Sequence, residues 1–445
     1  MNLRRWLSVG MGIKRWLFVV FIGELCLALG GAFALRQLYR DIEITGPLQG
    51  VVTWLTLQPL PYVVRGIVLG VIGVSLFVVG SIRTIRAIME PLRSPDADQP
   101  LVEVIYQKRF LARGPRIVAI GGGTGLSTLL RGLKEHTSNL TAVVTVADDG
   151  GSSGKLREQF GVPAVGDIRN CIVALADAEP VMAELLQYRF PESTATGERA
   201  DVSSLAGHAI GNLLIAALTA VEGGDFEEGV RQMNRVLAVR GQVLPVSPTP
   251  VVLHARRTDG SVVDGQSRIA RATGIERVWL APDDVVVSED AIRAIAEADV
   301  IVLGPGSLFT SILPSLLMPR IRDAVQASTA VRVYVCNVAT QDGETAGFDL
   351  ADHLEALAAH TASGLVDVVL ANNHVVADGT DGSHSDPVKL RWPPAGSAPP
   401  RLVLDDVINP DHPHHHDPAR LAAAVVRAAE REGAARRRPG VGRTA

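Results

Sequence analysis

The sequence predicts an α/β protein with a mostly parallel sheet, preceded by a two-helix transmembrane hairpin. From Gly114 onward, short apolar runs alternate with helix-like stretches, which is the pattern of a layered α/β domain. Several of these runs end directly in glycine-rich turns, as is typical of the ligand edge of a parallel sheet. Two apolar segments of twenty residues come before this pattern, and each is long enough to cross a bilayer core.

The two apolar segments, 16–35 and 63–82, are the predicted membrane spans. The first contains one charged residue, Glu24, and the second has Arg65 near its beginning, where a long side chain can reach the interface. A cleaved signal peptide is the alternative for the first segment, but its apolar stretch is too long and a second span follows. Basic residues precede the first span and follow the second. We therefore expect a multi-pass protein of the cytoplasmic (inner) membrane with both termini in the cytoplasm.

Composition divides the chain into four parts. We expect a membrane hairpin over 1–90, a linker over 91–113, an α/β domain over 114–431 and a basic, disordered tail over 432–445. The formal net charge of −4 over 445 residues gives no indication of a nucleic-acid partner. Three cysteines stand singly without a CxxC pair, which indicates a reducing compartment.

The elements of the α/β domain follow from local pattern. The predicted strands are 116–120, 141–146, 300–303, 331–336 and 366–370. The predicted helices are 207–220, 225–239, 288–298 and 418–431, the last with Asp417 as N-cap and Pro418 at its first position. Residues 251–263 contain an Asp-Gly turn between short apolar runs and predict an antiparallel β-hairpin. Residues 372–401 are rich in Gly, Asp, Ser and Pro and predict an exposed loop.

The first predicted strand runs into the glycine-rich turn 121–125 and then a helix. Glycine allows a sharp turn and a close approach to a ligand, and the helix N-terminus offers unpaired N–H groups to a phosphate. The spacing departs from the dinucleotide fingerprint, whose third glycine would fall at Leu126, and no Lys-Ser or Lys-Thr pair closes the turn as in a Walker loop. A tight turn without a ligand remains the alternative.

The second predicted strand leads to Asp148 and Asp149, close to where an acidic residue meets a ribose hydroxyl in dinucleotide-binding folds. Adjacent carboxylates cannot easily face the same atom. We expect one of them to bind a sugar hydroxyl or a metal and the other to brace the loop 150–154. The alternative is that Asp148 serves only an Asx-turn.

Further polar clusters follow other apolar stretches, and a parallel sheet would gather the strand ends along one edge. His208 is as well explained by a capping or core role as by a functional one. For the cluster 411–417, a solvated loop is preferred over a metal site, and metal binding by His412–His416 stays open. Eight candidate ligand residues rest on these clusters and on the glycine turns: Ser152, Ser153, His208, Gly304, Gly306, Ser307, Asn337 and Gln341.

Six motifs closely resemble the gluconeogenesis-factor family (YvcK-like proteins), which is related to 2-phospho-L-lactate transferase (CofD). They occur in order at 121–133, 144–154, 166–177, 207–214, 304–312 and 335–345. The resemblance covers residues 116–370 and implies a three-layer α/β/α Rossmann-like, nucleotide-binding domain. The positions that match the shared ligand motifs are Gly121, Gly122, Gly123, Thr124, Gly125, Asp148, Asp149, Asp167, Asn170 and Asn212. The family often has Arg-His-Asp-Pro before its last helix, whereas this chain has His415 in place of that arginine.

The resemblance implies a regulator that binds a nucleotide-sugar such as UDP-N-acetylglucosamine and links carbon metabolism to envelope synthesis and cell shape. Such a regulator has no catalytic residue, requires no cofactor or metal, and has envelope-synthesis proteins as candidate partners. Homo-oligomerisation stays open. The alternative is a phospholactyl-type transferase, in which Asp148 and Asp149 would hold Mg²⁺ across a nucleotide diphosphate. An NAD-dependent oxidoreductase, which would rest on the first glycine turn alone, is disfavoured by Leu126.

Overall fold

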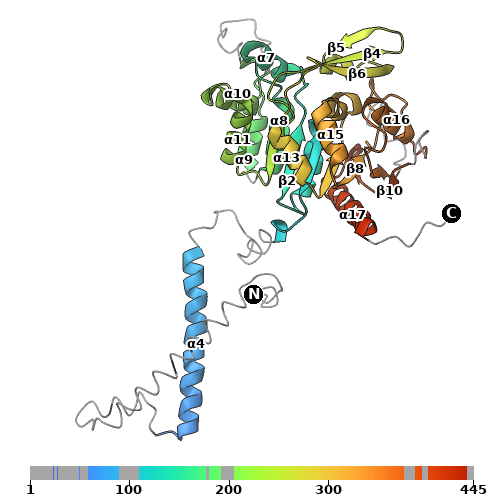
Figure 1. Ribbon diagram of the computed structural model, residues 1–445. Helices are drawn as coiled ribbons and strands as arrows, with labels where there is room; N and C mark the ends of the chain where they lie inside the picture. Colours follow the sequence, from blue (N-terminus) through green and yellow to red (C-terminus); the bar gives the residue numbers. More distant parts are fainter. Residues whose placement is uncertain are drawn as a thin grey trace, which may run out of the picture. The chain divides into compact units, whose positions relative to one another are not determined.

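The computed structural model describes Glu24, Ala28, Gly50 and residues 59–89, 110–176, 180–191, 205–374, 386–392 and 399–437. The chain divides into two compact units, Met1–Arg109 and Phe110–Ala445. Figure 1 shows helix α4 (Tyr62–Met89) of the first unit, and the second unit as a layered α/β body.

The prediction of a multi-pass membrane protein is contradicted. Among the described residues, no helix combines the length and the apolar character that a membrane crossing requires. The second expected span, 63–82, lies within α4, where the uncharged stretch between Arg65 and Arg83 is 17 residues long. This is at the lower limit of the about 17–25 apolar residues of spanning helices. The first expected span, 16–35, lies outside the described residues apart from Glu24 and Ala28.

The larger unit is built on a parallel sheet, as predicted. The described residues form a seven-stranded sheet of order β10-β9-β8-β7-β1-β2-β3, in which every pairing is parallel. Its strands are β1 (Ile117–Gly121), β2 (Leu140–Val144), β3 (Gln242–Pro245), β7 (Val300–Leu303), β8 (Val331–Val335), β9 (Val368–Asn372) and β10 (Arg401–Asp405). All residues of β1, β2 and β7 are buried, because helices cover both faces of the sheet.

The order of the strands decides which helices cover which face. The chain moves outward from β1 to β3, returns to β7 on the other side of β1, and moves outward again. Right-handed crossovers then place the helices of the two halves on opposite faces. Accordingly α6 (Gly123–Leu133) packs against α8 (Gly166–Leu175) of the same half. Helix α17 (Pro418–Arg437), which follows the last strand and is not a crossover helix, also packs against α6. Helices α13 (Glu289–Glu297) and α15 (Pro319–Ala327) pack together and lie in front of the sheet in Figure 1.

Helix starts follow the N-cap signals in the sequence. The Asp225 side chain accepts from the N–H of Glu228 at 3.0 Å and begins α11 (Phe226–Val236). Ser288 caps α13 in the same way at 3.3 Å. The Asp417 side chain accepts from the N–H of Arg420 at 2.8 Å ahead of α17. These three helices begin where the sequence predicted them, because each cap satisfies backbone N–H groups that the helix leaves free.

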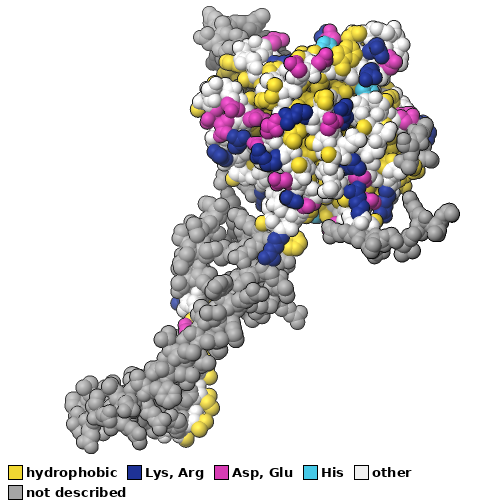
Figure 2. Space-filling view, viewed as in Figure 1, with side chains coloured by type: hydrophobic (Ala, Val, Ile, Leu, Met, Phe, Trp, Pro, Cys, Tyr) yellow, Lys and Arg dark blue, Asp and Glu magenta, His cyan; other side chains and the backbone are white. Residues whose placement is uncertain are grey.

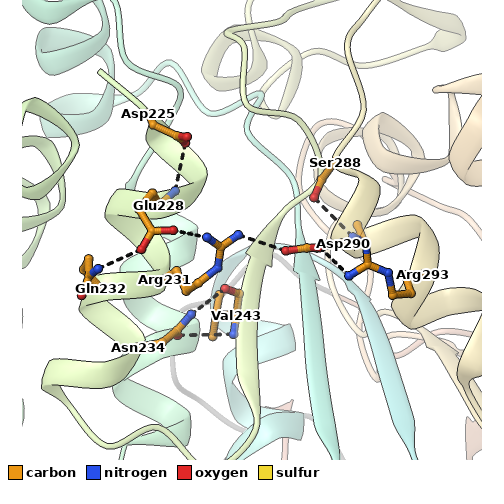
Figure 3. Close-up of polar contacts among 10 residues, drawn as sticks. Asp225, Glu228, Arg231, Gln232, Asn234, Val243, Ser288, Asp290 and Arg293 are labelled. Carbon is orange, nitrogen blue, oxygen red and sulfur yellow. Dashed lines mark hydrogen bonds and ion pairs between the residues drawn. The ribbon is translucent and has the colours of Figure 1, made fainter. Parts of the chain in front are cut away.

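Side chains of α11 fix the edge strand β3 (Figure 3). The Asn234 amide bonds to the Val243 carbonyl at 2.9 Å and to its N–H at 3.3 Å, so a side chain pairs with strand backbone. Arg231 joins Glu228 of its own helix to Asp290 of α13 across this edge. The contacts occupy part of a backbone edge that would otherwise be open to further strand pairing.

A second, antiparallel sheet of order β5-β4-β6 confirms the predicted hairpin. Strands β4 (Val252–Arg257) and β5 (Val262–Asp264) flank the Asp-Gly turn, and β6 (Ile275–Ala281) is a third strand that was not predicted. On the visible face of the larger unit, Figure 2 shows basic and acidic side chains interspersed over the described elements.

Candidate functional site

The central crevice of the sheet lies where its strand order reverses. Strand β1 lies between β2 and β7, so the chain leaves β1 and β7 in opposite directions. In open α/β sheets, ligands bind outside the carboxyl ends of strands at such a switch point. Both strands end there in predicted glycine turns, Gly121–Gly125 and Gly304–Ser307.

The two glycine turns are packed against each other closely enough to exclude side chains. A methyl group at Gly125 would lie 2.7 Å from the Pro305 carbonyl oxygen, and one at Gly306 would lie 3.3 Å from the Gly122 carbonyl oxygen. Helix α6 begins inside the first turn at Gly123, whose φ of 68° favours glycine. The absence of side chains brings the backbone of both turns, and the positive end of α6, to one place.

The end of β8 contributes a third group to this edge. The Asn337 side chain bonds to both backbone polar groups of Gly306, and Gln341 Nε2 donates to Ser307 Oγ at 2.7 Å. Gln341 Oε1 is buried and has no hydrogen-bond partner among the described residues. Predicted residues from β7 and β8 are therefore in direct contact.

Glu344 lies next to this group, within the motif at 335–345, and was not predicted as a site residue. It is buried, and its carboxylate accepts from the N–H of Phe309 and from Thr310 Oγ1, both at 2.9 Å. Desolvation raises the pKa of Glu344 to about 7, although these hydrogen bonds oppose the shift. Its geometry assigns it to the start of the π-helical turn η3 (Leu308–Ile312).

Asp148 and Asp149 face different partners, as their adjacency suggested. Asp149 Oδ1 accepts from the N–H of Ser267 at 2.8 Å and ties this loop to the short helix α12 (Gln266–Ile269). Asp148 Oδ1 accepts from the N–H of Gly150 at 2.9 Å, which is the Asx-turn geometry, and its other oxygen lies toward Gly166. The two carboxylates therefore do not form one paired ligand set.

Asp167 connects the β2 side of the edge to the first glycine turn. A methyl group at Gly122 would lie 2.5 Å from Asp167 Oδ2. Burial raises the pKa of Asp167 to about 7, the negative charge of Asp148 adds to the rise, and a hydrogen bond from the Gly123 backbone opposes it. Asp148, Asp167 and Gly122 thus form one continuous group of contacts, which meets Gly306 through the packed turns.

A buried polar cluster lies beyond Asp167, at the starts of α7 (Gly151–Phe160) and α10 (Ile210–Val221). Ser152 Oγ lies 3.1 Å from His208 Nδ1 and accepts from Asn212 Nδ2 at 3.0 Å. Burial lowers the pKa of His208, and the positive charges of Lys155 and Arg189 lower it further. His208 is therefore neutral at pH 7, which fits Ser152 donating to its Nδ1. Asn212 Oδ1 has no hydrogen-bond partner among the described residues.

The remaining predicted residues lie in the same elements. Thr124 is exposed in the first turn of α6, and Ser153 Oγ accepts from the N–H of Gly166, the first residue of α8, at 3.1 Å. Asn170 accepts from Arg169 Nη2 at 2.9 Å. Arg169 was not predicted, because an arginine in a helix usually lies in solvent, whereas this one is 7% exposed.

The histidine cluster does not form the solvated loop that was predicted. Residues His412–His416 form β12, which pairs with β11 (Ile408–Asn409). His416 is buried, and desolvation lowers its pKa to about 4. Among the described residues, no group of three or more His, Cys, Asp or Glu side chains is arranged to hold a metal ion.

A cavity of about 340 Å³ lies at the opposite edge of the sheet, at the amino ends of β1 and β2, lined by Arg116, Asn139 and Glu297 among others. None of the predicted site residues lines it. The chemistry gathered at the carboxyl edge therefore defines the candidate site.

The strand order, the crevice at its reversal and the paired glycine turns define a Rossmann-like α/β protein with a ligand site at the carboxyl edge of its sheet. Residues 117–390 match the family model described as 2-phospho-L-lactate transferase CofD. The chain belongs to this CofD family, and its curated relatives include proteins named gluconeogenesis factor.

Three similar proteins illustrate how far the likeness extends. A relative from Nostoc sp. is 42% identical over 437 residues, which is 95% of this chain and 92% of the relative. The gluconeogenesis factor of Bacillus subtilis is 47% identical over 269 residues, or 60% of this chain and 82% of that protein. A crystal structure of a Bacillus halodurans protein matches with a TM-score of 0.65 at 41% identity, and the match covers 71% of this chain and all of the other.

Proposed function

We propose that this chain is a regulatory protein that binds a nucleotide-sugar, of the UDP-N-acetylglucosamine type, in the crevice at the carboxyl edge of its sheet. Binding would link carbon metabolism to cell-envelope synthesis and cell shape. Support for the metabolic part comes from relatives that are named gluconeogenesis factor. Support for the ligand class comes from the site itself.

The observation that carries the proposal is the close packing of the two glycine turns at the strand reversal. A methyl group added at Gly125 would clash with the Pro305 carbonyl oxygen, and one added at Gly306 would press on the Gly122 carbonyl oxygen. The N-terminus of α6 suits a diphosphate, since it offers positive potential and backbone donors. In this structure the N–H groups of Gly123 and Gly306 are bound to the side chains of Asp167 and Asn337, which a diphosphate would replace as acceptors. Asp148, Asp167 and Asn337 add acceptors and donors for sugar or base groups on either side of the turns.

A binding role without chemistry fits the two adjacent carboxylates. Asp148 and Asp149 accept hydrogen bonds from two different parts of the backbone. A metal held across a nucleotide diphosphate would draw on oxygens that face one point. A transferase with Mg²⁺ is retained as the second candidate, because the matching family model carries that description.

Thermal-shift titration of the full chain separates the two. UDP-N-acetylglucosamine is expected to raise Tm in proportion to the logarithm of its concentration above Kd, without Mg²⁺ and without turnover. GDP and GTP serve as comparison ligands. Release of GMP from a guanosine diphosphate carrier, dependent on Mg²⁺ and a deazaflavin acceptor, would instead establish the transferase. A chain that no uridine nucleotide stabilises would refute the proposed ligand class.

A further inference from the structure

A buried guanidinium lies beside the glycine crevice with two donors unused. Arg169, in the first turn of α8, is 7% exposed. Its Nη2 donates to Asn170, but Nε and Nη1 are buried and have no hydrogen-bond partner among the described residues. Burying a charged donor without an acceptor is costly, because the group loses its water and gains nothing in exchange. A bound ligand with hydrogen-bond acceptors could therefore satisfy these two nitrogens, which the described residues leave without a partner.

The charge around Arg169 is not balanced by ionised carboxylates. Arg189 lies close enough to lower the pKa of Arg169, in addition to the larger effect of desolvation. Arg189 Nη1 and Lys155 Nζ donate to backbone carbonyls, at 2.6 and 3.0 Å. Asp148 and Asp167 are the carboxylates that raise the pKa of Arg169, and Asp167 is itself only partly ionised at neutral pH. Arg169 and Arg189 therefore lie near two carboxylates, of which Asp167 is only partly ionised.

Three helices also direct their N-termini to this place. Ser153 of α7 bonds to the first residue of α8, and Ser152 lies within 3.4 Å of the Ala209 N–H that precedes α10. The helices are 10, 10 and 12 residues long, so each adds positive potential at its start. Together with the unpartnered guanidinium, these N-termini favour a negatively charged ligand.

An unused acceptor belongs to the residue that follows a glycine packed on Arg169. Asn212 is 1% exposed, and its Oδ1 is buried without a hydrogen-bond partner among the described residues. The adjoining Gly211 packs on the stem of Arg169, since a methyl group there would lie 2.8 Å from its Cγ and Cδ. A ligand that satisfies both side chains carries an anionic group beside a hydroxyl.

We propose that Arg169 donates through Nε and Nη1 to the β-phosphoryl group of the nucleotide-sugar, which lies farther from the glycine turns than the α-phosphoryl group, while Asn212 Oδ1 accepts from a hydroxyl of the attached sugar. This rests on the proposed function and deepens it, because it assigns the two phosphoryl groups to different parts of the site. The contact between Asp167 and Gly122 makes the two parts continuous. Both donors are closed to solvent in this conformation, so binding includes a local opening step.

The test compares UDP with UMP, which lacks the second phosphoryl group. Isothermal titration is carried out with the full chain, with Arg169→Lys, with Arg169→Met, and with Arg293→Gln as a control on the exposed side of α13. The unchanged chain and the control are expected to prefer UDP. Either Arg169 variant is expected to lose roughly 10- to 100-fold in affinity for UDP, with little loss for UMP, which is the range for hydrogen bonds to a charged group. A folded variant that retains the UDP preference would overturn the proposal.

A second measurement separates this subsite from the nucleotide-sugar function, and the outcome that refutes it needs only the unchanged chain. Inorganic pyrophosphate is titrated into the unchanged full chain while the arginine Nε–H resonances are followed by NMR. The proposal expects one of these resonances to shift on saturation and to be absent from the spectrum of Arg169→Lys. If pyrophosphate shifts it but no uridine nucleotide binds, the subsite stands and the proposed function fails. If pyrophosphate leaves all Nε–H resonances unchanged, the subsite is refuted.

Discussion

The side-chain amide of Asn337 bonds to both backbone polar groups of Gly306: Nδ2 donates to the carbonyl at 3.1 Å, and Oδ1 accepts from the N–H at 3.3 Å. One side chain at the end of β8 thereby holds the glycine turn that follows β7. That glycine turn packs on Gly122, so the contact between Asn337 and Gly306 also sets the spacing between the two glycine turns.

Replacing Asn337 with Asp tests this role, because Asp keeps the shape but loses the Nδ2 donor. The Gly306 carbonyl would lose its partner, and a new negative charge would face the expected diphosphate. We expect roughly a tenfold or greater loss of affinity for UDP-N-acetylglucosamine, by analogy with lost charged and polar contacts. Isothermal titration calorimetry measures this loss of affinity. The control is Gln326→Glu on the exposed face of α15, which adds the same negative charge away from the site. Equal effects from both variants would show that only net charge matters.

Gly125→Ala is expected to push the two glycine turns apart. The new methyl group would meet the Pro305 carbonyl oxygen at 2.7 Å, and backbone cannot move aside as a side chain can. We expect a loss of about 1–3 kcal/mol in the free energy of unfolding, together with weaker ligand binding. Gly433→Ala in α17 is the matched control, since its methyl group would meet only Val331, at 3.9 Å. Urea denaturation compares them, and equal stability of the two variants would contradict the packing argument.

Asp167 should make stability and ligand binding depend on pH near neutrality. Its pKa rises from 3.8 to about 7 on folding, so the folded chain binds this proton more tightly than the unfolded chain. Stability from this group therefore falls as pH rises from about 4 to about 7. Asp167→Asn removes the effect, and we expect its Tm to exceed that of the unchanged chain at pH 8 by more than at pH 5. A difference that is independent of pH would show that Asp167 is ionised throughout.

Ser152→Ala is expected to destabilise the fold even without ligand. The hydroxyl accepts from Asn212 Nδ2 and lies 3.1 Å from His208 Nδ1, and all three side chains are buried. Its removal leaves buried polar groups without partners, which typically costs about 1–3 kcal/mol. Urea denaturation measures this against Ser363→Ala, which changes an exposed serine. If both variants unfold at the same urea concentration, the cluster contributes nothing to stability.

The edge of β3 offers two contacts of different expected strength (Figure 3). Arg231→Gln breaks ion pairs of a side chain that is 40% exposed, and we expect a loss of about 1 kcal/mol or less. Asn234→Ala leaves both backbone groups of Val243 without their side-chain partner, and we expect a loss of about 1–3 kcal/mol. Thermal unfolding ranks the two variants. The reverse order would mean that the ion pairs, and not the amide, hold this edge.

The strands buried on both faces could be predicted from the sequence. An unbroken short apolar run, such as that of β1 or β7, is the pattern of a parallel strand covered by helices on both faces. The short edge strands β3 and β10 were not predicted. Edge strands carry a weaker pattern, and β10 has intermediate or exposed residues throughout. Strand β6 was missed for the same reason, since its burial alternates only in part. The expected second membrane span was wrong because hydropathy over a twenty-residue window tolerated the charge at Arg65, whereas the first lies outside the described residues apart from Glu24 and Ala28.

Taken alone, the sequence determined the features that depend on neighbours along the chain: the buried strands, the helix cap at Asp417, and the glycine turns after β1 and β7. Tertiary structure alone decided which of those turns meet, that Asp149 is directed to Ser267 while Asp148 faces Gly166, and that Arg169 is buried. The physical reason is the separation along the chain of the residues that set each feature. Backbone conformation and capping are set by a few adjacent residues, whereas burial and side-chain direction depend on contacts between segments many residues apart.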